Sequence, residues 1–146
     1  KRQGLPHRCR LVRQLNGIRW FNDSKATNVG ACVAAINGLA GSGNIILIAG
    51  GVGKDQDFSE LTSALKQSVK AVVLMGVDAD KIAKVIPPGV EQIQASDMAD
   101  AVKIAQSIAS EGDNVLLSPA CASFDMFSSY ADRGNSFEQA VRQIAA

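Results

Sequence analysis

Residues 22–28, "NDSKATN", place an acid, an ammonium group, two hydroxyls and two amides within seven positions. Two other stretches are similarly polar: 50–58, "GGVGKDQDF", and 118–134, "SPACASFDMFSSYADRG". Ammonium groups, hydroxyls and the backbone N–H groups at the start of a helix all donate hydrogen bonds. If the three stretches meet in space, we expect them to bind an anion, either a phosphate or a carboxylate.

The candidate donors are two lysines and four hydroxyl residues: Lys25, Lys54, Ser24, Thr27, Ser118 and Ser123. Each has a simpler interpretation, because an isolated loop lysine is more often only solvated, and Thr27 and Asn28 are suited to cap a helix. Asp23 and Asp55 could accept hydrogen bonds from hydroxyl or ammonium groups of the ligand, or they could pair with the lysines. Phe124, Phe127 and Tyr130 could equally anchor the hydrophobic core, and His7 is expected to be structural and not catalytic.

Several common catalytic arrangements are excluded. A triphosphate-binding P-loop needs a glycine and a hydroxyl where "GGVGKD" has Ile48 and Asp55. There is no GxGxxG turn, no pair of catalytic carboxylates and no Ser-His-Asp set. The cysteines are Cys9, Cys32 and Cys121, without CxxC spacing, so we assign no metal ligands and expect free thiols in a reducing, cytoplasmic compartment.

The apolar pattern predicts the elements that position the polar stretches. Alternating residues around Asn16-Gly17 predict a hairpin over 9–21, since that dipeptide suits a type I′ turn. Apolar residues at helical spacing predict a helix over 29–39, with Asn28 as its cap, and Ser96 is expected to cap another over 97–109. Further predicted strands are 45–49, 71–75 and 115–117, and further predicted helices are 58–66, 79–85 and 137–145.

Buried strands that alternate with helices predict an α/β fold, a three-layer sandwich with a mostly parallel, Rossmann-like sheet, helices on both faces and an N-terminal β-hairpin. With 146 residues, the chain is expected to form a single domain over 1–146. In open α/β sheets ligands bind beyond the carboxyl ends of the strands. The three polar stretches follow three predicted strands, so we expect them to converge there.

Charge and hydropathy argue against two classes of partner. Residues 1–25 hold seven Lys or Arg against one Asp, but no aromatic residues interleave with Arg8, Arg10, Arg13 and Arg19. We interpret them as a solvated strand face and expect no nucleic-acid partner. No apolar run approaches the roughly 18 residues of a membrane span, and the basic start lacks the features of a signal peptide.

Five motifs together resemble the C-terminal domain of the Mur ligase family of peptidoglycan synthesis, and within it the ligases that add D-glutamate. They are "GLPHR" at 4–8, "NDSKATN" at 22–28, "NG" at 37–38, "GG..K..DF" at 50–58 and "LLSPACASFD.......RG" at 116–134. Phe124 and Tyr130 depart from that pattern, where leucine and phenylalanine are familiar. These departures bear on the shape of the pocket.

The resemblance implies a three-domain enzyme of which this chain is the last, amino-acid-binding domain. The missing N-terminal domain would bind the UDP-sugar, and the missing central domain would hold most of the ATP and magnesium. The implied reaction phosphorylates the carboxylate of UDP-N-acetylmuramoyl-L-alanine, and the amine of D-glutamate then attacks the acyl phosphate. The isolated domain is expected to be inactive, and its partners are these substrates and its own central domain.

The resemblance also implies roles for individual residues. Lys54 would pair with a carboxylate of D-glutamate, Thr27 and Ser123 would donate hydrogen bonds to its two carboxylates, and Lys25 would add charge near the reacting end. Phe124 and Tyr130 would form the wall of the pocket. Arg8 and Asp23 would face the ribose and phosphates of the nucleotide. Two alternatives remain: a stand-alone module that binds an anionic metabolite or nucleotide, and a different amide ligase of the superfamily.

Overall fold

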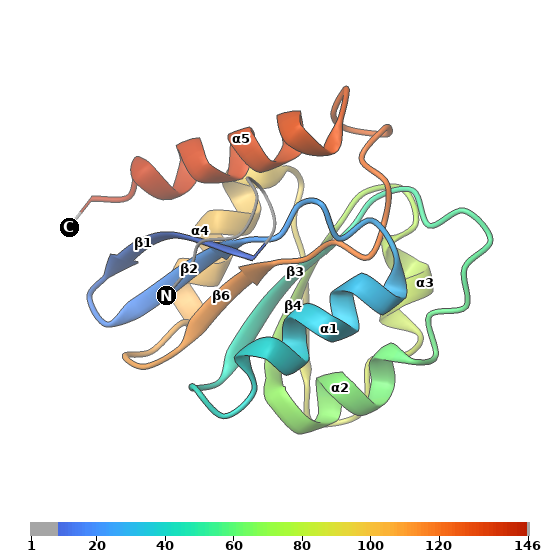
Figure 1. The fold of residues 1–146 in the computed structure, drawn as a ribbon, viewed down its shortest axis with the longest axis horizontal. Helices are drawn as coiled ribbons and strands as arrows, with labels where there is room; N and C mark the ends of the chain where they lie inside the picture. The colour runs from blue at the N-terminus through green and yellow to red at the C-terminus, as the bar shows by residue number, and fades with distance from the viewer. Residues whose placement is uncertain (1–8, 146) are drawn as a thin grey trace.

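The computed structural model describes residues 9–145, which form a sheet between two layers of helices (Figure 1). The strand order is β1-β2-β6-β3-β4-β5, and only the β1–β2 pair is antiparallel. This confirms the predicted fold class. In chain order the elements are β1 (Arg10–Leu15), β2 (Ile18–Asn22), α1 (Val29–Leu39), β3 (Ile45–Gly50), α2 (Leu61–Ser68), β4 (Val69–Met75), α3 (Ala79–Ala83), β5 (Glu91–Gln94), α4 (Met98–Ile108), β6 (Asn114–Leu117) and α5 (Tyr130–Arg142).

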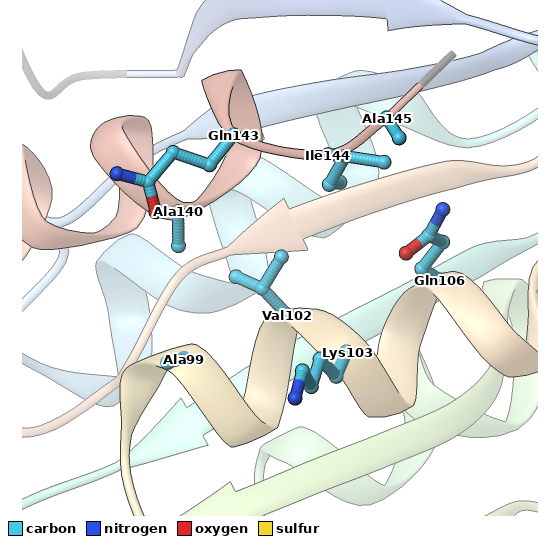
Figure 2. A pocket seen from close by; sticks show the side chains of 8 residues that line it. All are labelled: Ala99, Val102, Lys103, Gln106, Ala140, Gln143, Ile144 and Ala145. Carbon is cyan, nitrogen blue, oxygen red and sulfur yellow. The ribbon is translucent and has the colours of Figure 1, made fainter.

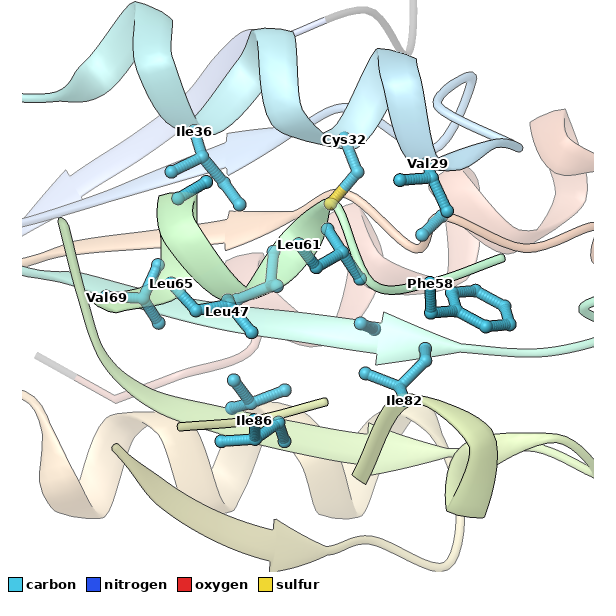
Figure 3. Close-up of a cluster of buried hydrophobic side chains, with 14 of the residues drawn as sticks. Val29, Cys32, Ile36, Leu47, Phe58, Leu61, Leu65, Val69, Ile82 and Ile86 are labelled. Atoms are coloured by element: carbon cyan, nitrogen blue, oxygen red, sulfur yellow. The ribbon is translucent and has the colours of Figure 1, made fainter. Parts of the chain in front are cut away.

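Each face of the sheet carries its own hydrophobic cluster. Residues of α1, α2 and α3 pack with Leu47, Val72 and Leu116 on one face (Figure 3), whereas α4 and α5 pack with Ile46, Val73 and Val115 on the other. Neighbouring residues of one strand point to opposite faces, and both faces are covered, so β3 is buried throughout its length. The continuous apolar run that predicted this strand follows from that double coverage.

The predicted hairpin and first helix are confirmed in detail. Asn16 and Gly17 have φ of 54° and 79°, as a type I′ turn requires. The side chain of Asn28 accepts a hydrogen bond from the backbone N–H of Ala31 and caps α1. Both predictions succeeded because a single local interaction decides each structure.

Several other boundaries were predicted incorrectly. The second helix begins at Leu61 and not at 58, and the last helix spans Tyr130–Arg142 and not 137–145. The cap of α4 is Asp97, whose carboxylate accepts from Asp100 N–H, while Ser96 donates to the carboxylate of Asp100. Strand β5 was missed, because Ile93 is its one apolar residue and the strand lies at the edge of the sheet.

The basic residues of the hairpin are not simply solvated. Arg13 donates to the carbonyl oxygens of Val141 and Ile144 at 2.8 and 2.9 Å, at the end of α5, where a positive charge complements the helix dipole. Arg10 lies 3.5 Å from the carboxylate of Glu138. These contacts tie the hairpin to α5, so the solvated-face interpretation is wrong for both residues.

Gly50 gives a direct test of how closely β3 approaches β4. It has φ of 127°, and an added Cβ would overlap the carbonyl oxygen of Met75. We expect Gly50→Ala to lower the free energy of unfolding by about 2 kcal/mol or more, measured by urea denaturation. Gly38→Ala is the matched control: nothing lies within 4 Å of its added Cβ, and this exposed helical site should gain about 0.5 kcal/mol. Equal effects would contradict the close approach.

Candidate functional site

The polar loops after β3 and β6 are joined directly to one another. Val52 and Ala122 form an isolated antiparallel bridge whose two N–H···O distances are both 2.9 Å. The N–H of Gly50 also donates to the carbonyl of Pro119 at 3.0 Å. Lys54 is two residues beyond one end of the bridge, and Ser123 is next to the other. The two residues therefore lie at the same edge of the sheet, as predicted.

The loop after β2 joins the same assembly. The N–H of Asp23 donates to the carbonyl of Leu117 at 2.7 Å, and that of Ala120 donates to the carbonyl of Ala26 at 2.9 Å. Because β2, β3 and β6 are parallel, their carboxyl ends share one edge, and all three polar loops leave from it (Figure 1). We call this edge, residues 22–28, 50–56 and 118–130, the polar rim.

Arg133 is hydrogen-bonded to two of these loops, the one after β2 and the one after β6. Its side chain is buried in α5, donates to the hydroxyl and carbonyl oxygens of Ser24 at 2.9 and 2.7 Å, and donates to the carbonyl of Cys121 at 2.9 Å. Burial lowers the pKa of Arg133 to about 10, so the guanidinium is still charged at neutral pH. A planar group with several fixed donors can bridge two loops in this way, whereas a lysine cannot.

Two of the four predicted hydroxyl donors serve the protein itself. Ser24 donates to the carbonyl of Tyr130 at 2.6 Å, and Ser118 donates to the carboxylate of Asp23 at 3.0 Å; both serines are fully buried. The other oxygen of Asp23 accepts from the N–H of Cys9 at 3.0 Å. The expectation that Ser24 and Ser118 face a ligand was therefore wrong, because burial commits their hydroxyls to internal bonds.

The start of α1 offers less to an anion than expected. The side chain of Gln56 accepts from the N–H of Val29 at 2.8 Å, and Asn28 accepts from the N–H of Ala31 at 2.9 Å. Two of the first three N–H groups of the helix are thus already used. The start of α1 therefore leaves few free N–H groups for an anion.

The remaining candidates lie on the rim and differ in their exposure. Thr27 and Lys25 are partly exposed, and the Lys25 ammonium lies 5.6 Å from the centroid of the Tyr130 ring. Lys54 is exposed, with φ of 53°. Ser123 is 2% exposed, and its hydroxyl makes no hydrogen bond within residues 9–145.

Two aromatic side chains stand out at the same rim. Phe124 is 70% exposed and Tyr130 is 38% exposed, which rules out the core-anchor interpretation for Phe124. Exposed aromatic rings beside polar groups are typical of binding surfaces. Arg8 and His7 lie outside the described residues, so the predicted nucleotide contact of Arg8 stays a prediction.

A fourth loop, residues 76–78 after β4, was missed by the sequence reasoning. The N–H of Gly53 donates to the carboxylate of Asp78 at 2.7 Å, and the N–H of Val77 donates to that of Asp125 at 2.8 Å. Both carboxylates bond the backbone of a neighbouring loop. The only signal in the sequence was the position of "GVD" directly after a buried strand.

No group of three or more His, Cys, Asp or Glu side chains within 9–145 is arranged to hold a metal ion. Nor is any helix in that range long and apolar enough to span a membrane. A groove of about 320 Å³ opens between α4 and α5 (Figure 2), away from the polar rim. Its lining contains none of the predicted site residues: Ala99, Val102, Lys103, Gln106, Ala140, Gln143, Ile144 and Ala145.

The fold and the rim together define an α/β domain whose polar loops gather at the carboxyl ends of its parallel strands. Residues 7–121 match the family described as "Mur ligase, glutamate ligase domain", and the chain belongs to that family.

Curated relatives agree with this assignment. The chain is 55% identical to UDP-N-acetylmuramoylalanine–D-glutamate ligase of Nitrosococcus oceani, over 97% of this chain and 31% of that protein. It is 52% identical to the enzyme of the same name from Legionella pneumophila strain Lens, over 97% of this chain and 32% of that one. The chain thus spans about a third of the length of these relatives.

Two solved structures share the fold. The MurF ligase of Thermotoga maritima aligns with a TM-score of 0.64 at 17% identity, over 98% of this chain and 33% of that one. The bifunctional folylpolyglutamate synthase/dihydrofolate synthase of Yersinia pestis aligns with a TM-score of 0.65 at 21% identity, over 95% and 31%.

The brace formed by Arg133 predicts a measurable loss of stability. Arg133→Met would leave three buried oxygens of Ser24 and Cys121 without their donor, so we expect the free energy of unfolding in urea to fall by about 2 to 4 kcal/mol. Arg142→Met on the same helix is the control, because its ion pair with Glu138 is largely exposed on the arginine side and should contribute under about 1 kcal/mol. Similar losses for both variants would argue against the brace.

The buried thiols predict a pattern of chemical protection. Burial raises the pKa of Cys32 and of Cys121 to about 12, so at about pH 8 both remain protonated and enclosed. Iodoacetamide should therefore modify neither residue in the native chain and both in urea, as read by peptide mass spectrometry. Cys9, which is partly exposed, serves as the internal comparison. Native modification of Cys121 at the rate of Cys9 would show that the β6 loop is open.

Proposed function

We propose that this chain is the C-terminal domain of a three-domain, ATP-dependent ligase that adds D-glutamate to UDP-N-acetylmuramoyl-L-alanine in peptidoglycan synthesis. The relatives of that name, at 55% and 52% identity over 97% of this chain, support the reaction. The Val52–Ala122 bridge supports the proposed position of the amino-acid site, because it brings Lys54 and Ser123 to the same edge of the sheet.

D-glutamate carries two carboxylates, so its pocket needs two groups of donors. The rim offers Lys54 and Ser123 on the loops joined by the bridge, and Thr27 and Lys25 on the loop at the start of α1. A carboxylate is bound most strongly by charged donors. We assign Lys54 to one carboxylate and Thr27 and Ser123 as hydrogen-bond donors, with Phe124 and Tyr130 as the apolar wall.

The chemical step belongs to groups beyond this chain. In the proposed reaction the γ-phosphoryl group of ATP passes to the carboxylate of UDP-N-acetylmuramoyl-L-alanine, and the D-glutamate amine displaces phosphate to form the amide. Residues of this chain would bind D-glutamate and orient its amine. By the resemblance to three-domain ligases, ATP and Mg²⁺ would be held mainly by a central domain, and Arg8 and Asp23 would approach the nucleotide.

Within this proposal Asp23 acts mainly through the loop that it supports. Its two oxygens receive the Ser118 hydroxyl and the Cys9 N–H, which fixes the chain on either side of it. Lys25 lies two residues further along and carries the charge to the surface of the rim. The cation–π contact of its ammonium, 5.6 Å from the centroid of the Tyr130 ring, restricts where that charge points.

Replacement of Lys54 tests the proposed pocket. In the full-length enzyme, Lys54→Ala should raise the KM for D-glutamate at least about tenfold, because loss of one partner of a desolvated charge pair costs about 2 to 5 kcal/mol. Lys66→Ala is the matched control, since this exposed lysine lies in the last turn of α2, at the opposite edge of the sheet, where β4 begins. An unchanged KM for Lys54→Ala would remove this residue from the pocket.

The same enzyme separates the competing functions. ATP hydrolysis that depends on D-glutamate, and not on L-glutamate or diaminopimelate, is expected of the proposed ligase. Turnover with another amino acid would indicate a different amide ligase. Binding of an anion without any amino-acid-dependent ATP hydrolysis would indicate a binding module.

A further inference from the structure

Gln56 lies where the three loops of the polar rim meet. Its side-chain oxygen accepts from the N–H of Val29 at 2.8 Å, and its side-chain nitrogen donates to the carbonyls of Ala120 and Gly53 at 2.9 and 3.1 Å. Val29 begins α1, Gly53 follows β3 and Ala120 follows β6. One partly buried amide thus joins all three loops.

The geometry defines the orientation of this amide. With its oxygen and nitrogen exchanged, an NH₂ group would face the N–H of Val29 and an oxygen would face two carbonyls, so all three contacts would become repulsive. As placed, both N–H groups and the oxygen are used. Glutamine is also the neutral side chain that offers two donors and one acceptor at this length, which explains its suitability here.

Each partner of Gln56 is close in sequence to a residue of the proposed pocket. Val29 is two residues after Thr27, and Gly53 directly precedes Lys54. Ala120 is three residues before Ser123. The three contacts of Gln56 therefore act on the three backbone segments that carry the proposed donors.

The contact with Ala120 restrains a strained backbone. Ala120 has φ of 62°, a left-handed conformation that costs a residue with a Cβ about 1 kcal/mol or more. Its N–H donates to Ala26 at 2.9 Å and its carbonyl accepts from Gln56, so bonds on both sides hold it there. Without Gln56, one of the two hydrogen bonds that hold the backbone of Ala120 is lost.

We propose that Gln56 is a positioning residue that sets the spacing of Thr27, Lys54 and Ser123 without touching the amino acid. This inference rests on the proposed function of the rim. A displacement of about 1 Å in groups that orient a substrate can reduce the rate about a hundredfold, so three linked loops need a common anchor.

The first test is Gln56→Ala in the full-length enzyme. We expect the KM for D-glutamate to rise about tenfold or more, because all three donors lose their register, while the KM for UDP-N-acetylmuramoyl-L-alanine stays within about twofold. Gln67→Ala is the matched control: within residues 9–145 the side chain of this exposed glutamine of α2 makes a single hydrogen bond, to the hydroxyl of Ser63 at 3.5 Å. Its KM values should equal those of the wild type.

Gln56→Glu gives a readout that a general loss of stability would not produce. A protonated carboxyl keeps the acceptor for Val29 and one donor, whereas the carboxylate loses both donors and faces two carbonyl oxygens. Those oxygens and burial favour the protonated form, so the pKa of this carboxyl should lie above its usual value of about 4.3. The KM ratio of variant to wild type should therefore be smallest near about pH 5.5 and grow as the pH rises.

The outcomes separate this inference from the proposed function. A raised KM for both Lys54→Ala and Gln56→Ala, with the pH-dependent ratio for Gln56→Glu, supports the positioning role. A raised KM for Lys54→Ala with wild-type values for Gln56→Ala overturns the positioning role alone. A KM ratio for Gln56→Glu that stays near one at every pH between about 5.5 and 8.5 also overturns it. Wild-type values for Lys54→Ala overturn the pocket itself.

Discussion

The parallel pairing of β6 with both β2 and β3 is the constraint on which the rim depends. Strand β6 is the last strand in the sequence but lies between these two in the sheet, so the segment that follows it emerges between their loops. The pairing of Phe21 with Leu116 and of Leu47 with Leu116 fixes the register on both sides. Segments more than 60 residues apart in sequence are thereby brought into hydrogen-bond contact.

The rim is built in two levels that differ in function. Below the surface, Ser24, Ser118, Asp23 and Arg133 use their polar groups on one another and on loop carbonyls. Buried polar groups must be paired, and a fully paired network also restricts the conformations of its loops. At the surface, Lys54 and Phe124 remain exposed. The buried polar residues, the lower level of the rim, thus hold the loops that carry its exposed residues, the upper level.

Residue type alone could not separate these two levels. Ser24 and Ser123 are both hydroxyl residues in polar loops that follow strands. The hydroxyl of Ser24 is hydrogen-bonded to Arg133 and to the carbonyl of Tyr130, whereas the Ser123 hydroxyl makes no hydrogen bond within the described residues. The distinction depends on contacts across more than 100 positions of sequence. Gln56 was overlooked for the same reason, because its three partners belong to three separate loops.

The fold was more predictable than the site, and the physical reason is visible in particular elements. Helix α1 and strand β3 carry strong periodic or continuous apolar patterns, and their predicted bounds are correct or one residue short. Strand β5 has one apolar residue, and the first two turns of α5 are mostly polar, so tertiary contacts decide both. The convergence of the loops was predictable because parallel strands end at one edge, whereas the individual bonds were not.

The exposure of the rim bears on how the proposed pocket would work. Charge pairs strengthen when water is excluded, yet Lys54 is exposed and Phe124 keeps 70% of its surface accessible. This chain therefore supplies donors and an apolar wall without enclosing them. In the proposed enzyme, a second domain that closes over Phe124 would remove water from the lysine and its carboxylate partner together. Binding strength would then depend on closure, while the rigid lower level keeps the donors in register before closure occurs.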